Sequence, residues 1–224
     1  MATGIYSEWS FIICQGVEIG HQSDSLCDNK GGFPMRILLS GLLFGLLLGN
    51  GVAKADGGNG FSQTVELQGI SFRVTCPNDS SINLLHVAPS GLSIDNTTIK
   101  QEIDGTVSGT EMADLNADGY PELYVYVTSA GSGSYGLLIA YGSNRNKSIS
   151  AIYLPSVSEN KKLAKGYMGH DEFAVGEGAL LHRFPIYREG DNNANPTGGM
   201  RQIQYKLIQG EAGWVLNVDR TIEY

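Results

Sequence analysis

Residues 122–128 read ELYVYVT, and this stretch decides the fold class. Aromatic and β-branched side chains follow one another in it, which is the composition that strands favour. The turn signal NADGYP (116–121) precedes it, and the glycine-rich stretch AGSGSYG (130–136) follows it. A second apolar run, GLLIAYG (136–142), comes next, so the sequence predicts two strands joined by a loop.

Alternation of apolar and polar residues recurs along the chain and predicts further strands. It covers residues 62–68, 71–76, 98–103, 148–155, 173–187, 201–208 and 214–224. Turn signals separate these runs at short intervals, and no run has the period of a long amphipathic helix. We therefore expect an all-β fold, an antiparallel β-sandwich or partly closed barrel with at most one short helix, in SVSENKKLAKG (156–166).

The N-terminal part carries a secretion signal. A Met-Arg pair (35–36) precedes an unbroken apolar run (37–48), and the triplet AKA (53–55) follows that run. One basic residue, a short apolar run and a small-x-small triplet are the parts of a signal peptide. The run is also shorter than the roughly 20 residues that span a bilayer. We expect a signal peptide over residues 35–55, with cleavage after Ala55 and no membrane association afterwards.

Residues 1–34 lie upstream of this signal and show no periodicity that would bury a core. Because a signal peptide begins at the start of a chain, we expect Met35 to be the initiator and residues 1–34 to reflect a misplaced start. The alternative is a cytoplasmic extension in front of an uncleaved anchor. Residues 56–224 are enough for one domain with its own core.

The mature chain, residues 56–224, is acidic and holds a single cysteine. It has 12 Lys and Arg against 19 Asp and Glu, a net charge of −7, which disfavours nucleic acid and anionic membranes as partners. With Cys76 alone, no internal disulfide and no cysteine-based metal site can form. Its place at the end of an alternating run predicts a half-buried structural thiol. We expect no cofactor.

The glycines of AGSGSYG formally match a dinucleotide fingerprint, since Gly131, Gly133 and Gly136 have GxGxxG spacing. That fingerprint needs a helix after the loop, because the amides at the helix N-terminus hold the pyrophosphate. A strand pattern follows the loop here, so the nucleotide interpretation fails.

The second hypothesis for this region is a catalytic triad of Ser134, His170 and Asp171. Neighbouring residues in a strand point to opposite faces, so Asp171 is poorly placed to orient His170. No nucleophile elbow surrounds the serines either. We expect no catalytic residues and no enzymatic activity.

Four oxygen-bearing side chains recur in DLNADGYPE: Asp114, Asn116, Asp118 and Glu122. The first three alternate ahead of a glycine, as in the first half of a calcium loop. The twelfth position is Val125, where an EF-hand requires a bidentate Glu, so this is not an EF-hand. Glu122 instead resembles the acidic ligand of the short calcium loops in integrin-type β-propeller blades. We favour the alternative, an Asx-rich turn without metal, in which side-chain oxygens cap backbone amides.

Presentation to a partner is the remaining interpretation of AGSGSYG. Its glycines allow backbone conformations closed to other residues. Its small hydroxyls and single tyrosine give polar contacts with little side-chain entropy to lose. Such a loop between two strands can enter a concave partner.

Three stretches together resemble one protein family: ADLNADGYPELYVYVTSAGSGSYG (113–136), YMGHDEF (167–173) and RFPIYREGDNNANPTGGMRQIQYKL (183–207). They are similar to the periplasmic inhibitors of invertebrate-type (i-type) lysozymes of Gram-negative bacteria. The resemblance implies a small β-rich periplasmic domain, commonly homodimeric, that blocks i-type lysozyme by inserting a loop into its substrate cleft. The long N-terminal extension departs from this family.

The family's inhibitory serine and tyrosine, three residues apart, fall on Ser132 and Tyr135. The inhibitory loop implied by the resemblance also contains Gly131, Gly133, Ser134 and Gly136. The competing hypothesis is a calcium-dependent extracytoplasmic β binding module centred on residues 114–122.

Overall fold

The structure, a computed structural model, describes residues 60–224. The expected upstream extension (1–34) and signal peptide (35–55) lie outside these residues. The described part contains twelve strands and one 3-10 helix, η1 (Val157–Glu159), which lies in the segment where a short helix is expected. Within the same part of the chain, no helix has the length and apolar composition needed to cross a membrane.

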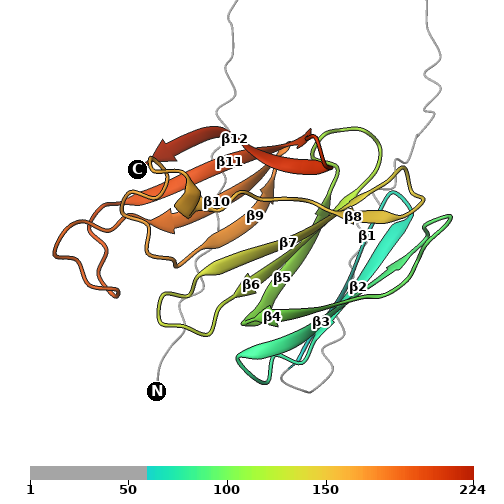
Figure 1. The fold of residues 1–224 in the computed structure, drawn as a ribbon, viewed down its shortest axis with the longest axis horizontal. Helices are drawn as coiled ribbons and strands as arrows, with labels where there is room; N and C mark the ends of the chain where they lie inside the picture. Colours follow the sequence, from blue (N-terminus) through green and yellow to red (C-terminus); the bar gives the residue numbers. More distant parts are fainter. Residues whose placement is uncertain (1–59) are drawn as a thin grey trace, which may run out of the picture. The chain divides into compact units, whose positions relative to one another are not determined.

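Three antiparallel four-stranded sheets make up the fold (Figure 1). The first, in the order β1-β2-β3-β4, contains β1 (Phe61–Leu67), β2 (Ile70–Cys76), β3 (Ile82–Ser90) and β4 (Ile99–Asp104). The second, in the order β5-β6-β7-β8, contains β5 (Thr106–Ala113), β6 (Glu122–Thr128), β7 (Gly136–Ser143) and β8 (Ile149–Ala151). The third, in the order β12-β11-β10-β9, contains β9 (Glu172–Gly176), β10 (Ala179–Pro185), β11 (Met200–Gln209) and β12 (Trp214–Glu223).

Strand β6 belongs to two hydrophobic cores at once. Leu123, Val125 and Val127 pack into a first core shared with the sheet β1–β4. Tyr124 is buried in a second core shared with the sheet β9–β12, and Tyr126 packs against the same core. Because successive side chains of a strand point to opposite faces, a continuous apolar run can serve both cores.

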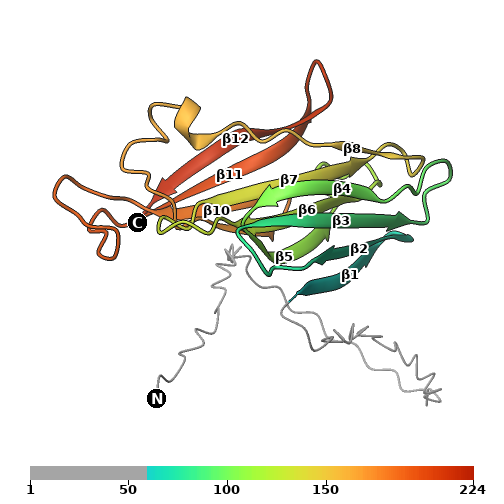
Figure 2. The same ribbon diagram turned by 60° about the horizontal axis from the view of Figure 1, so that its bottom comes forward.

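The sheet β5–β8 is therefore the middle layer of the fold, between the other two sheets (Figure 1). In Figure 2, the strands β12 and β1 lie outermost on opposite sides of it. The predicted all-β sandwich is confirmed, with three sheets instead of two. None of the sheets within residues 60–224 closes into a barrel.

The strand β3 is missing from the predicted set because its burial runs against its hydropathy. Its inward positions include Asn83, which is only 4% exposed. Its outward positions include Ile82 and Leu84, which are 57% and 45% exposed. Burial still alternates along the strand, but polar and apolar residues do not alternate with it, so the period-two signal is lost.

The other differences from the predicted strands have local causes. In β5, also missing from the predicted set, the pairing register shifts between Val107 and Gly109, and a bulge of this kind interrupts the alternation. The run 173–187 is a hairpin of β9 and β10 and not one strand, with Glu177 and Gly178 between them. Cys76, predicted to be half-buried, is 3% exposed and belongs to the first core.

Truncation of Leu123 tests the central position of β6. This side chain is 0% exposed, so Leu123→Ala should lower the free energy of unfolding by about 2 to 5 kcal/mol through lost burial and a residual cavity. Leu137→Ala, on the neighbouring strand β7, removes a side chain that is 46% exposed and should cost about 1 kcal/mol or less. Denaturant unfolding of both variants measures the difference, and equal losses would contradict the burial of β6 in the first core.

Candidate functional site

The loop between β6 and β7, residues 129–135, is closed by its own hydrogen bonds. The backbone N–H of Ser129 donates to the carbonyl of Tyr135 at 2.9 Å, and the N–H of Tyr135 donates to Oγ of Ser129 at 3.0 Å. Further out, the N–H of Ser134 donates to the carbonyl of Gly131 at 2.9 Å. Ser134 adopts a φ of 43°, in the left-handed region that non-glycine residues rarely occupy. The loop is therefore a compact turn with a defined backbone.

A second segment, residues 167–171, packs directly against this loop. The N–H of His170 donates to the carbonyl of Gly133 at 2.7 Å, and the ring of Tyr135 meets the ring of Tyr167 edge-on at 5.7 Å between centroids. The two backbones approach so closely at Gly169 that a Cβ atom there would lie 2.2 Å from the carbonyl oxygen of Gly133. Only glycine fits at this position, which explains the glycine in YMGHDEF.

Asp171 connects the base of the loop to the protein interior. Its side chain is 0% exposed. Its carboxylate accepts from the backbone N–H of Gly136 at 2.8 Å and from the hydroxyl of Tyr167 at 2.8 Å. Nε2 of His182 lies 2.5 Å from the other carboxylate oxygen. A buried carboxylate needs such donors, and here they come from three separate elements.

His182, on β10, completes this buried pair. Its ring stacks on Phe173 at 4.2 Å between centroids and also lies against Phe184. An ionised carboxylate can only accept, so we assign the proton of this contact to Nε2 of His182. Nδ1 is buried and has no hydrogen-bond partner among residues 60–224. Burial and the neighbouring Asp171 also raise the pKa of the Tyr167 hydroxyl, which therefore stays protonated and able to donate.

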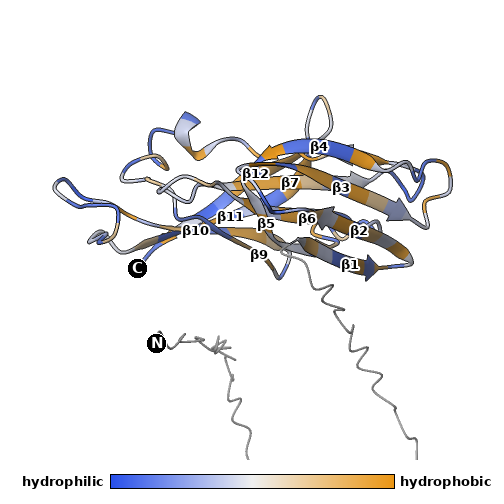
Figure 3. Ribbon diagram, turned by 90° about the horizontal axis from the view of Figure 1, so that it is seen from below, coloured by the Kyte–Doolittle hydropathy of each residue, from blue (hydrophilic) through white to orange (hydrophobic). Residues whose placement is uncertain are grey.

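A third segment, the loop between β10 and β11, reaches the tip of the same turn. Nδ2 of Asn193 donates to the carbonyl of Ser132 at 2.5 Å. This loop is ordered by Asp191, whose carboxylate accepts from the N–H groups of Arg188 at 2.7 Å and Thr197 at 2.8 Å. Figure 3 shows the loop to be hydrophilic along much of its length. The three stretches that carry the family resemblance thus meet in space.

The side chains expected to contact a partner remain accessible. Ser132 is exposed, and its hydroxyl makes no hydrogen bond within residues 60–224. The ring of Tyr135 is 48% exposed, since one edge rests on Tyr167. Met168, in the adjacent segment, is 40% exposed. The loop therefore combines a fixed backbone with free side chains.

Neither the dinucleotide site nor the catalytic triad considered for this region has the required geometry in the described residues. The strand β7 begins at Gly136, so no helix follows the GxGxxG spacing. Asp171 bonds to His182, whereas Nε2 of His170 lies 3.2 Å from Oδ1 of Asn193. The expectation that His170 and Asp171 point to opposite faces of one strand was wrong. Neither residue lies in a strand, because β9 begins only at Glu172, and His170 has a φ of 56°.

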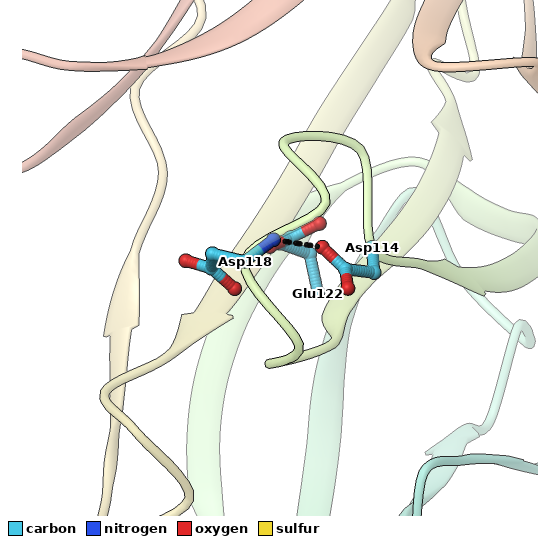
Figure 4. Close-up of side chains that lie close together, drawn as sticks. All are labelled: Asp114, Asp118 and Glu122. Atoms are coloured by element: carbon cyan, nitrogen blue, oxygen red, sulfur yellow. Dashed lines mark hydrogen bonds between the residues drawn. The ribbon is translucent and has the colours of Figure 1, made fainter.

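The acidic turn lies at the other end of β6. Ligand atoms of Asp114, Asp118 and Glu122 lie within 4.8 Å of one another (Figure 4). Most of the carboxylate oxygens already accept from backbone N–H groups of the turn. Asp114 accepts from Asp118 at 2.9 Å and from Gly119 at 2.8 Å, and Asp118 accepts from Tyr120 at 2.9 Å. This is the pattern of the Asx-rich turn favoured from the sequence.

Glu122 differs from its two neighbours because it is buried, with 3% of its surface exposed. Burial is the main reason why the pKa of Glu122 is raised from 4.5 to about 7; the hydrogen bond from the N–H of Leu115 opposes this rise, and the charges of Asp114 and Asp118 contribute to it. Asn116 takes part only through hydrogen bonds with Asp118. The turn therefore holds a carboxyl group whose charge is costly in the folded protein.

Comparisons of the chain with models of protein families, with curated proteins and with solved structures found no match. The likeness to the lysozyme inhibitors consequently stays a prediction from the quoted stretches. Sequence reasoning assigned no role to Tyr167, Asp171, His182 or Asn193. The signal that could have pointed to Tyr167, Asp171 and Asn193 is the presence of YMGHDEF and GDNNANPTGG beside AGSGSYG in the resemblance, whereas His182 lies in none of these stretches.

Replacement of Asp171 tests the buried connection. Asp171→Ala leaves Nε2 of the buried His182, the hydroxyl of Tyr167 and the N–H of Gly136 without their acceptor, so the free energy of unfolding should fall by about 3 kcal/mol or more. Glu177→Ala, at an exposed carboxylate in the β9–β10 turn, should change it by about 0.5 kcal/mol at most. Denaturant unfolding compares the two, and a small loss for Asp171→Ala would mean that the loop is held by other contacts.

Glu122 predicts a pH dependence of stability. Its folded pKa of about 7 exceeds its ordinary value of 4.5, so the folded state retains a proton that the unfolded chain releases between these values. The contribution of Glu122 to stability is thus full below about pH 4.5 and lost as the pH rises through about 7, on the order of 3 kcal/mol in all. Glu122→Gln should lose less stability over this range, while Glu66→Gln, at an exposed carboxylate, should follow wild type.

Denaturant unfolding of the three proteins from pH 4 to 8 measures this difference, and parallel curves would exclude the buried charge.

Calcium extends the same experiment. If the turn binds calcium, the ion favours ionised Glu122, and the melting temperature of wild type at pH 8 should rise on adding calcium but not in Glu122→Gln. An unchanged melting temperature would contradict calcium binding by this turn.

Proposed function

We propose that this chain is a secreted periplasmic inhibitor of i-type lysozyme, and that it inserts the loop of residues 130–136 into the substrate cleft of the enzyme. The observation that carries the proposal is the fixed backbone of this loop. The carbonyl of Ser132 bonds to Asn193, and the carbonyl of Gly133 and the N–H of Gly136 bond to the segment 167–171. A loop that is ordered before binding loses little conformational entropy on entering a cleft.

The chemistry of a lysozyme cleft suits the two accessible side chains. Such a cleft holds two carboxyl groups flanking the glycosidic bond, and one of them is protonated as the general acid. The hydroxyl of Ser132 can donate to a carboxylate or accept from a carboxylic acid, so it can satisfy either group without bringing in a charge. The half-exposed ring of Tyr135 supplies an aromatic anchor of the kind that dominates interface energetics.

In this proposal the chain supplies contacts and no catalytic residue or cofactor. A homodimer, and the absence of nucleic-acid and membrane partners, belong to it as predictions. The edge strand β12, exposed from Asn217 onward, is one edge that a second copy could cover. The net charge of −7 over residues 56–224 would attract a basic partner protein at long range.

A calcium-dependent binding module is the second candidate function. The observation in its favour is the approach of the three carboxylates of Asp114, Asp118 and Glu122 within 4.8 Å. The backbone donors that already occupy these oxygens favour a structural turn instead. The calcium measurement described for Glu122 separates the two functions, because the inhibitor proposal needs no metal.

The loop proposal predicts a large loss of inhibition in a double variant. Ser132→Ala with Tyr135→Ala should weaken inhibition of an i-type lysozyme at least a hundredfold, since each truncated contact in a desolvated cleft costs about 2 kcal/mol. Stability should change little, because Ser132 is exposed and about half of Tyr135 is exposed, outside its contact with Tyr167. The matched control is Ser93→Ala with Tyr153→Ala, which removes the same groups from exposed positions elsewhere.

Inhibition constants for the three proteins, each checked for its melting temperature, decide the matter. Equal constants for wild type and the loop variant would mean that the partner binds elsewhere. No inhibition by wild type in excess would remove the lysozyme proposal itself.

A further inference from the structure

We infer that Asn193 is a positioning residue for the inhibitory loop: it fixes the backbone at Ser132 and thereby directs the hydroxyl of that residue at the partner. The inference rests on the proposed function for its effect on inhibition. The ordering of residues 131–134 by Asn193 does not depend on the proposed function.

Asn193 holds the tip of the loop by its side-chain amide. Nδ2 donates to the carbonyl of Ser132 at 2.5 Å, across 61 residues of sequence. The next carbonyl along, that of Gly133, accepts from the N–H of His170. Two consecutive carbonyls at the tip therefore have donors from two other segments, which fixes the orientation of the peptide planes on either side of Gly133.

Asn193 is itself held in place on both sides. Its backbone carbonyl accepts from the hydroxyl of Tyr187 at 3.0 Å, and Tyr187 is only 7% exposed. Its Oδ1 lies 3.2 Å from Nε2 of His170, whose ring stacks on that of Tyr187 at 6.4 Å. The amide thus bridges the loop tip to the segment 167–171, and its donor faces Ser132.

The sequence around Ser132 explains why such a tether is needed. Glycines stand on both sides of it, at positions 131 and 133, and glycine leaves the backbone free to adopt many conformations. Neither Gly131 nor Ser132 is buried, so packing does not restrict them. Without the donor from Asn193, the peptide after Ser132 can rotate, and the position from which the Ser132 side chain projects is no longer fixed.

The Asn193→Asp variant tests this role with little change in shape. A carboxylate cannot donate to the carbonyl of Ser132, but it still accepts from His170. The matched control is Asn192→Asp, which adds the same charge one residue away. Oδ1 of Asn192 accepts from the N–H of Ala194 and from Asn195, and an aspartate retains both bonds. Asn193→Leu removes the donor without adding charge, so it separates the lost hydrogen bond from a charge effect on the partner.

We expect Asn193→Asp and Asn193→Leu to weaken inhibition of an i-type lysozyme by about tenfold, because each variant loses the hydrogen bond that orients the backbone at Ser132. Asn192→Asp should stay within about twofold of wild type. In the background of Ser132→Ala, the Asn193 variants should have little further effect, because the hydroxyl that they misdirect is gone.

Amide relaxation by NMR supplies a readout that needs no lysozyme. Order parameters for residues 131–134 should fall in both Asn193 variants and stay unchanged in Asn192→Asp, with the melting temperature of all variants close to that of wild type. Unchanged order parameters would overturn the tether. Lowered order parameters with undiminished inhibition would overturn the positioning role. If wild type itself does not inhibit, the proposed function fails, while the relaxation comparison still decides whether Asn193 orders the loop.

Discussion

Both faces of strand β6 are covered by other sheets, and the two hydrophobic cores of the protein meet on it. Leu123, Val125 and Val127 face one core, and Tyr124 faces the other. A strand of this kind must be covered by a sheet on each side, because leaving either face open would expose a continuous apolar row. The order of the three sheets follows from that constraint. It also makes β6 and its partner β7 the base from which the acidic turn and the loop of residues 130–136 extend.

The two candidate sites lie at opposite ends of this strand. The acidic turn leads into Glu122, and the loop of residues 130–136 follows Thr128. Seven residues of extended chain place these ends about 20 Å apart. The separation means that changes at the acidic turn and changes at the loop can be measured independently. Glu122 begins the strand, and its buried carboxyl group contacts Leu115 and Tyr124 of the second core.

The loop owes its conformation to residues far away in the sequence. Asp171 fixes its base, the backbone at His170 fixes Gly133, and Asn193 fixes Ser132. A glycine-rich loop without these partners would keep much of its conformational freedom, and it would lose that freedom only on binding. Three segments that each look like ordinary turns in the sequence therefore become one ordered surface. This arrangement suits a function based on presentation, where accessible side chains need a fixed backbone.

The sequence by itself determined the fold class, the strand–loop–strand unit around AGSGSYG and the Asx-rich character of the turn, because alternation, glycine and Asx patterns are local signals. It did not reveal β3, where Asn83 is buried and Ile82 exposed, since the side that a residue faces is decided by the neighbouring sheets. Nor did it reveal the third sheet layer, for which the apolar run of β6 needed a partner on each face. The roles of Asp171, His182 and Asn193 were decided only by the tertiary structure, because a hydrogen bond between residues dozens of positions apart leaves no periodic trace in the chain.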